Sequence, residues 1–244
     1  MRFWRRDLRR VDPLLFRLAH ELVQPGSIVW DIGANVGLFA FAAAFLAGRS
    51  GSVLAIEADD WLAALLRKST LSLPANHARI DVLTTGVAAA TSIADFCLAQ
   101  RGRAANHLAS VTGSTQAGGV RSVQKVVTVT LDWLLDWFPP PHLVKLDVEG
   151  AELECLRGAN QLLTRERPAL ICEISSENAP GVGCLLSGHG YTLYDAEKSL
   201  NDRVPLEIPA WNTIAVPVPS TRHQEAPPPT GGVSPRRTAV GRTR

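Results

Sequence analysis

The sequence predicts a single doubly wound α/β domain, in which helices cover both faces of a mostly parallel sheet of seven strands. Three observations support this fold class. The chain has 244 residues, of which 46% are hydrophobic and 20% are charged, enough to enclose one sizeable core. Apolar strand-like and helix-like segments alternate from residue 27 to residue 83, as in parallel sheets with crossover helices. A glycine-rich turn follows the first strand directly, at the place where such folds bind ligands.

The first helix is indicated by its two ends. Asp12 is a favourable N-cap, Pro13 suits the first helical position, and Pro25-Gly26 ends the helical pattern. A short apolar strand over 27–32 follows, and then an almost wholly apolar helix over 36–47. That run is about half the length of a membrane-spanning helix, so we expect it to pack against the sheet.

The next unit completes the alternation of strands and helices. A strand over 53–58 precedes a helix that Asp59 can cap and that extends to residue 71, and a third strand covers 79–83. Right-handed crossovers place the ends of parallel strands at one edge of the sheet. We therefore expect the residues that follow these strands to form a shared ligand crevice.

The second half of the chain has shorter segments separated by turn residues. A polar loop occupies 100–122, and loops of this length inside compact domains are usually functional or disordered. Three consecutive prolines stop a short helix before residue 139. In order, we expect strands over 91–99, 123–130, 143–147 and 169–174, helices over 131–138 and 151–163, and a closing strand pair over 191–194 and 213–216.

The two ends of the chain are basic, whereas the body between them is acidic. The first 20 residues and the last 28 each have a net charge of +4, which leaves −6 on the remainder. An acidic body disfavours nucleic-acid binding, because that function needs clustered cations on the folded part. We expect a basic segment with a leading helix over 1–24, the folded domain over 25–217, and a disordered Pro/Arg-rich tail over 218–244.

The compartment and further partners are predicted from the same composition. The four cysteines have no Cys-x-x-Cys spacing, and no apolar signal segment precedes the first helix, so we expect a cytoplasmic protein. No apolar run is long enough to span a membrane. The N-terminal arginines, with Phe3, Trp4 and Leu8, favour at most a weak peripheral contact with an anionic membrane. The sequence leaves the oligomeric state open.

The turn from Asp31 to Gly37, together with Glu57, predicts a cofactor site. Glycines let the backbone approach a ligand closely, but this turn lacks the Gly-x-Gly-x-x-Gly spacing that cradles a pyrophosphate. Glu57 ends the next strand, where a carboxylate can accept both hydrogen bonds of a ribose diol. The combination favours a ribose-bearing ligand without a pyrophosphate. The predicted cofactor-binding residues are Asp31, Gly33, Ala34, Asn35, Gly37, Glu57 and Ala58.

A charged strand end from Lys145 to Gly150 is the third signal. Period-two alternation puts Lys145, Asp147 and Glu149 on one side of the strand, although strands covered on both faces are normally continuous apolar runs. Burying such charges is costly unless they are paired. One interpretation is a structural ion pair between Lys145 and Asp147. The other is that these side chains line the cleft beside a reacting group.

Taken together, these segments resemble the FkbM-type methyltransferases over roughly residues 20–217, nearly the whole folded body. The resemblance implies a class I methyltransferase fold with S-adenosylmethionine as cofactor. It also implies a small-molecule acceptor, usually a sugar or natural product that is methylated on a hydroxyl. The matching segments are the string Val144–Glu152, which is the most specific, the Asp31–Gly37 turn, Glu57, Thr130-Leu131-Asp132 and the strand that ends in Glu173.

Methyl transfer requires the protein to position the acceptor and to take up its proton. A carboxylate base is one way to do this, and a divalent cation that activates the hydroxyl is the alternative; no separate set of metal ligands is indicated. Two other functions stay open, a nicotinamide-dependent oxidoreductase and a non-catalytic cofactor-binding relative. The predicted catalytic residues are Lys145, Asp147, Glu149 and Glu173, and the predicted substrate residues, in the polar loop, are Asn106 and His107.

Overall fold

The computed structural model describes residues 11–111 and 118–219 of the chain. The predictions for the N-terminal arginine cluster and for the tail beyond residue 219 lie outside these residues. No helix in the described part is long and apolar enough to cross a membrane.

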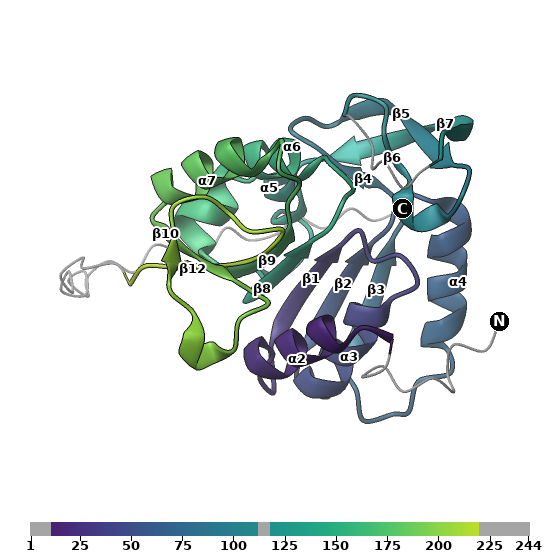
Figure 1. Cartoon of the computed structure of the whole chain (residues 1–244). Helices are drawn as coiled ribbons and strands as arrows, with labels where there is room; N and C mark the ends of the chain where they lie inside the picture. Colours follow the sequence, from purple (N-terminus) through teal and green to yellow (C-terminus); the bar gives the residue numbers. More distant parts are fainter. Residues whose placement is uncertain (1–10, 112–117, 220–244) are drawn as a thin grey trace, which may run out of the picture.

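One large sheet forms the centre of the molecule (Figure 1). Its order is β11-β10-β12-β9-β8-β1-β2-β3. Neighbouring strands from β9 to β3 are parallel, and β12 is antiparallel to both β9 and β10. This order confirms the predicted class I methyltransferase fold, with a two-residue eighth strand added at one edge. The strands are β1 (Ile28–Ile32), β2 (Ser52–Ile56), β3 (Arg79–Leu83), β8 (Leu143–Leu146), β9 (Ala169–Glu173), β10 (Tyr191–Asp195), β11 (Pro205–Leu206) and β12 (Asn212–Pro217).

Helices cover both faces of this sheet, as predicted. Alternate strand residues point to opposite faces, so Val29 and Val53 contribute to one buried cluster while Trp30 and Leu54 contribute to the other. Helices α2, α3 and α4 pack on the first cluster, and α5, α6 and α7 on the second. Their bounds are α2 (Pro13–Leu22), α3 (Leu38–Ala47), α4 (Asp60–Thr70), α5 (Leu131–Leu134), α6 (Glu152–Arg157) and α7 (Ala179–Gly188), with a π-helical turn over Leu162–Glu166 after α6.

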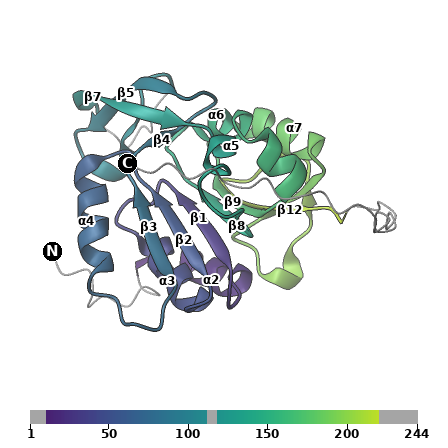
Figure 2. The ribbon, with the colours of Figure 1, turned by 180° about the vertical axis from the view of Figure 1, so that it is seen from behind.

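A second, four-stranded sheet was not predicted. The segments expected as further strands over 91–99 and 123–130 pair with each other, not with the large sheet, and the polar loop between them contains a 3-10 turn, η2 (Arg103–Ala105), and a short strand. Figures 1 and 2 show this sheet beside the β3 edge of the large one. Its order is β4-β7-β5-β6, with β4 (Gly86–Val87), β5 (Ser92–Ala99), β6 (His107–Leu108) and β7 (Val120–Val129).

Helix α7 was missed because its sequence contains Pro180, Gly181 and Gly183, which are typical of a turn. The proline occupies the first turn of the helix, where its missing N–H is tolerated. A Cβ at Gly181 would lie 2.7 Å from the Leu153 side chain, and one at Gly183 would lie 2.9 Å from Pro209. The glycines therefore permit close packing of α7 rather than a chain reversal.

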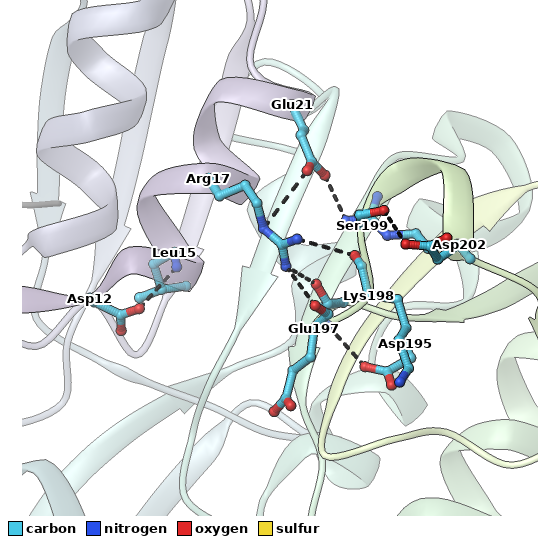
Figure 3. A network of polar contacts seen from close by, with 11 residues as sticks. Asp12, Leu15, Arg17, Glu21, Asp195, Glu197, Lys198, Ser199 and Asp202 are labelled. Carbon is cyan, nitrogen blue, oxygen red and sulfur yellow. Dashed lines mark hydrogen bonds and ion pairs between the residues drawn. The ribbon is translucent and has the colours of Figure 1, made fainter.

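Hydrogen bonds and an ion pair connect helix α2 to the segment that follows β10 (Figure 3). The Arg17 guanidinium donates hydrogen bonds to the carbonyl oxygens of Ala196 at 2.6 Å, Glu197 at 3.1 Å and Lys198 at 3.2 Å. One turn further along α2, a Glu21 oxygen lies 2.7 Å from an Arg203 nitrogen. The network joins residues that are about 180 positions apart in the sequence.

Replacing Arg17 with alanine is expected to lower the free energy of unfolding by about 1–3 kcal/mol, because three carbonyls lose a charged donor. Denaturant titration of the wild type and the variant measures the difference. Arg49→Ala is the matched control, since Arg49 donates a single exposed hydrogen bond to the Ala75 carbonyl. Equal losses in the two variants would contradict a structural role for the Arg17 network.

Candidate functional site

A cavity of about 140 Å³ opens where the predicted crevice lies, between the carboxyl ends of the central strands and the small sheet. Parallel sheets present their ligand sites at this edge. The large sheet and the segments after its strands supply one wall, and the small sheet with η2 supplies the other. The lining residues are Ile32, Gly33, Asn35, Ile56, Glu57, Ala58, Thr85, Gly86, Val87, Phe96, Arg103, Ala104, Asn106, Leu108, Asp147, Val148, Glu149, Ala151 and Glu173.

The turn after β1 is shaped by positive backbone angles. Gly33 has a φ of +76°, and a Cβ there would lie 1.8 Å from the Asp147 carbonyl oxygen. Asn35 adopts a φ of +52°, a conformation that asparagine tolerates better than most residues. Gly37, with a φ of +86°, is the N-cap of α3. The turn therefore passes directly against the segment after β8, and glycine is required for that approach.

Glu57 holds the first turn in place as well as lining the cavity. One carboxylate oxygen accepts the Asn35 N–H at 2.8 Å, and the other accepts the Asp59 N–H at 2.8 Å. Burial raises the pKa of Glu57, against the lowering effect of these two hydrogen bonds. Each oxygen retains acceptor capacity for a ligand, because a carboxylate has about four lone-pair sites.

Asp59 links helix α4 to the opposite wall of the cavity. Its carboxylate caps α4 through the N–H groups of Trp61 and Leu62. It also pairs with the Arg103 guanidinium and accepts a hydrogen bond of 2.8 Å from the Asn106 amide. The Arg103 guanidinium lies 4.8 Å from the centre of the Trp61 ring. Residues on η2 are thus fixed against the N-terminus of α4, which closes one side of the cavity.

Lys145 does not line the cavity, but it joins two carboxylates, one of which, Asp147, does. Its ammonium nitrogen is 3.0 Å from an Asp147 oxygen and 3.4 Å from an Asp31 oxygen, and it donates to the Gly33 carbonyl at 3.3 Å. Burial on its own would lower the pKa of Lys145, but Asp147 and Asp31 outweigh it and raise the pKa well above the usual value. Lys145 therefore stays protonated and connects the segments after β1 and β8. The ion pair proposed in the structural interpretation of this strand is present.

A strained loop presents Glu149 to the cavity. Glu149 has a φ of +53° and Gly150 a φ of +102°, and a left-handed glutamate is costly. The buried Glu152 carboxylate accepts the Gly150 N–H at 2.9 Å, and the Asn178 amide donates to the Gly150 carbonyl at 2.8 Å. Asn178 also bonds the Glu152 carboxylate at 3.2 Å. These contacts fix the loop in a conformation that it would not adopt by itself.

Two cavity carboxyl groups have pKa values near neutrality. Burial and the neighbouring Asp147 carboxylate raise the pKa of Glu149 from 4.5 to about 7. Burial and Asp147 also raise the pKa of Glu173, from 4.5 to about 7. Groups with such values can exchange a proton near physiological pH, as a general base must.

The structure brings most of the predicted site residues to one place. Asp147, Glu149 and Glu173 line the cavity together with Gly33, Asn35, Glu57, Ala58 and Asn106. Five predicted residues are not among its lining residues: Asp31, Ala34, Gly37, Lys145 and His107. His107 follows Asn106 directly, but it pairs with Cys97 of β5, and one ring nitrogen lies 3.1 Å from the Ala105 carbonyl oxygen.

Sequence reasoning missed several lining residues, most of them on the small sheet and η2. Arg103 lies in the polar loop, where no sequence pattern marks it as a site residue. Phe96 lies in a predicted strand whose neighbour in the sheet was not predicted. Thr85 follows β3 and could have been found by the rule that strand ends line the crevice. Asp132, noted for its family resemblance, has a structural role: its carboxylate accepts the N–H groups of Gln161 and Leu162 at 2.9 Å.

The carboxylates of the site do not form a preassembled metal centre. In residues 11–111 and 118–219, no three metal-ligating side chains lie close enough together to hold an ion. A divalent cation shared between these carboxylates and the acceptor stays a prediction.

A family model and a curated relative both identify this chain as similar to methyltransferases. The model of the methyltransferase FkbM domain matches residues 31–202. The hexuronic acid methyltransferase AglP of Haloferax volcanii is 28% identical over 165 residues, which are 66% of this chain and 61% of that protein. The chain thus spans less than two thirds of the length of this curated relative.

Two solved structures with a similar fold have low sequence identity to this chain. The methyltransferase FkbM from Methylobacillus flagellatus is 16% identical with a TM-score of 0.47, covering 82% of this chain and 50% of that one. The precorrin-6y C5,15-methyltransferase from Geobacter metallireducens is 13% identical with a TM-score of 0.48, covering 84% and 86%.

Proposed function

Because the chain belongs to the FkbM methyltransferase family, we propose that it transfers a methyl group from S-adenosylmethionine to a hydroxyl of a sugar or natural-product small molecule. The observation that supports this most directly is the cavity at the carboxyl ends of the strands, where Glu149 and Glu173 have pKa values of about 7. The name of the AglP relative, a hexuronic acid methyltransferase, supports a sugar acceptor. Family membership favours this reaction over the oxidoreductase alternative.

The cavity lining suits the charge of the proposed cofactor. Among the described residues, four carboxylates and one guanidinium line it, and that guanidinium is paired with Asp59. A sulfonium and an ammonium group are favoured in such surroundings, but a pyrophosphate would be repelled. Glu57 lines the cavity and accepts the Asn35 N–H, which supports the proposal that it binds the ribose hydroxyls.

The chemical step needs little from the protein beyond position and proton transfer. The cofactor supplies a methyl group on a positively charged sulfur, so the acceptor oxygen forms a new O–C bond while the C–S bond breaks. The hydroxyl proton must leave at the same time. We propose that Glu149 takes it, with Glu173 on the neighbouring strand end as the second acceptor.

The pKa values give a pH profile with a defined sign. A base with a pKa of about 7 is protonated and inactive below that value, so turnover should rise about tenfold per unit at low pH and level off above pH 7. Single-turnover rates measured from pH 5 to pH 9 report this profile. A flat profile across that range would contradict a carboxyl base in the cavity.

The same values predict how protein stability depends on pH. Raised carboxyl pKa values mean that the folded state binds more protons than the unfolded state between pH 4.5 and about 7. The contribution of Glu149 and Glu173 to stability is therefore fully present below pH 4.5 and lost as pH rises through 7. Replacing Glu173 with glutamine should raise the melting temperature at pH 8 and change it little at pH 4.5.

Cofactor choice is tested by calorimetry with S-adenosylmethionine, S-adenosylhomocysteine and NAD. Binding of the first two and not of NAD is expected. Glu57→Gln should weaken S-adenosylhomocysteine binding by about 1.5–3 kcal/mol, the usual contribution of hydrogen bonds to a charged group. Glu177→Gln, at a residue that does not line the cavity, is the control. Unchanged affinity in Glu57→Gln would remove Glu57 from the cofactor site.

The acceptor class is tested by transfer of a labelled methyl group from S-adenosylmethionine to a panel of sugars, glycosides and phenolic natural products. A product that resists alkali and carries the label on oxygen supports hydroxyl methylation. Label found only on nitrogen or carbon acceptors would overturn the proposed reaction.

A further inference from the structure

We infer that the acceptor is an uncharged polyhydroxylated ring that packs against the Trp211 indole while its hydroxyls donate to the carboxylates at the cavity mouth. This inference rests on the proposed function and narrows it, because it distinguishes a neutral sugar from a hexuronic acid. Two independent features of the site support it: the charge of the lining and the position of an exposed tryptophan.

The lining is strongly acidic. Glu57, Asp147, Glu149 and Glu173 line the cavity, and Arg103 is the one cationic residue among the described residues that do so. Arg103 is paired with the Asp59 carboxylate, and Lys145 is shared between Asp31 and Asp147. A hexuronate carboxylate entering this cavity would meet like-charged side chains, and the two cationic side chains nearby, Arg103 and Lys145, are already paired.

Like charges in a binding site discriminate against an anionic ligand in favour of a neutral one. Burial is the main cause of the raised pKa values of Glu149 and Glu173, and repulsion from the neighbouring Asp147 carboxylate raises both further. Neutral hydroxyl groups have the opposite preference: they donate hydrogen bonds, and carboxylates only accept them. The lining therefore matches a polyol better than an acid.

Trp211 stands next to these carboxylates. Its carbonyl accepts the Ile174 N–H at 2.7 Å, and the following residue, Asn212, pairs with Glu173 across β12 and β9. The Trp211 side chain forms a hydrogen bond with the Glu173 carboxylate. This hydrogen bond lowers the pKa of Glu173, but burial has a larger effect and raises it. The residue is nevertheless 54% exposed. The indole does not itself line the cavity, but it contacts Glu173, which does, and it offers a flat apolar surface to solvent beside that residue.

An aromatic face and a set of hydrogen-bond acceptors recognise different parts of one sugar ring. The C–H faces of the ring pack on the aromatic surface, and the hydroxyls on its edge reach the polar groups. Packing of the ring on Trp211 would orient one hydroxyl toward Glu149. The tryptophan itself would take no part in proton transfer. Trp211 is thus proposed as a positioning residue for the acceptor.

The charge arm of the test uses three pairs of acceptors: the methyl glycosides of glucose, galactose and mannose, and the methyl glycosides of the corresponding uronic acids. With the wild type, kcat/KM should be at least about tenfold higher for the neutral member of an accepted pair, the effect of one unrelieved charge repulsion. The ratio should shrink in 0.5 M salt and in Glu173→Gln, where a negative charge is removed. A wild-type preference for the uronic acids would overturn the inference.

The tryptophan arm measures KM and kcat separately on the best neutral glycoside. Trp211→Ala should raise KM by about tenfold, with kcat and S-adenosylhomocysteine affinity close to wild type, and Trp211→Phe should retain most of the affinity because the aromatic face remains. Trp137→Ala is the control, since Trp137 is 67% exposed and its ring neighbour is Trp133, 5.7 Å away, rather than a carboxylate of the cavity lining.

The outcomes separate the two proposals. Trp211→Ala kinetics equal to those of Trp137→Ala, in an enzyme that methylates neutral glycosides, would overturn the positioning role alone. A wild type that binds S-adenosylhomocysteine but methylates none of the six glycosides would overturn the sugar acceptor, and this inference with it. A raised KM for both tryptophan variants would assign the effect to general surface loss rather than to Trp211.

Discussion

Replacing Glu149 with glutamine is expected to lower turnover by about 10²–10⁴-fold, the usual contribution of a positioned general base. Asp147→Asn should lower it as well, because Asp147 lines the cavity and pairs with Lys145 beside Glu149. An amide keeps the shape of each side chain but cannot take up a proton. Both variants should retain the fold and most of the S-adenosylhomocysteine affinity, measured by thermal unfolding and calorimetry.

Glu154→Gln is the matched control, since Glu154 pairs with Arg157 on the exposed side of α6 and does not line the cavity. A chelator then separates the two modes of activation: loss of wild-type activity that Mg²⁺ or Mn²⁺ restores indicates a metal, and no loss indicates a carboxylate base. If Asp147→Asn unfolds while Glu149→Gln stays fully active, the charged strand end has only the structural role.

Replacing Gly33 with alanine is expected to lower the free energy of unfolding by more than about 4 kcal/mol, in the range reserved for severe backbone conflicts. The new Cβ would lie 1.8 Å from the Asp147 carbonyl oxygen and 2.8 Å from its carbonyl carbon, and φ is +76°. Neither backbone can yield, because Gly33 N–H bonds the Ile56 carbonyl and Asp147 N–H bonds the Ile32 carbonyl. Cofactor binding should be lost in any folded fraction.

Gly48→Ala isolates the effect of close approach from that of backbone angle. Gly48 also has a positive φ, +63°, but nothing lies within 4 Å of a Cβ there. The control should cost about 1–3 kcal/mol, the strain of an unfavourable angle alone. Urea titrations measure the free energy of unfolding of both variants. Equal losses for Gly33→Ala and Gly48→Ala would contradict the close contact between the turn after β1 and the segment after β8.

The fold was predictable from the sequence where local patterns decide it. The strands from β1 to β3 are short apolar runs between capped helices, and Asp12 and Asp59 cap their helices as predicted. The antiparallel insertion of β12 between β9 and β10 depends on pairing between distant segments, which no local pattern encodes. The small sheet was missed for the same reason, since β5 pairs with a strand across the polar loop.

Some residues of the candidate site were likewise predictable from local sequence patterns, and others were not. The residues after β1, β2, β8 and β9 were predicted because parallel strands bring their carboxyl ends together. Arg103 and Phe96 reach the cavity only through the small sheet, so their role required its topology. Asn106 and His107 were predicted together, yet adjacent residues of an extended segment point to opposite sides, and only Asn106 lines the cavity.

The placement of β12 has a practical consequence for dissecting the protein. The family match begins at residue 31 and ends at residue 202, so a fragment cut to those bounds would lack α2, β11 and β12 and the first three residues of β1. Removal of β12 would leave β9 and β10 with open edges in the middle of the sheet, and open strand edges recruit other chains. Removal of α2 would also strip the carbonyls of residues 196–198 of their Arg17 donors. Such a fragment should precipitate or form oligomers through strand exchange, whereas a fragment that ends after Pro217 keeps every strand of the sheet paired.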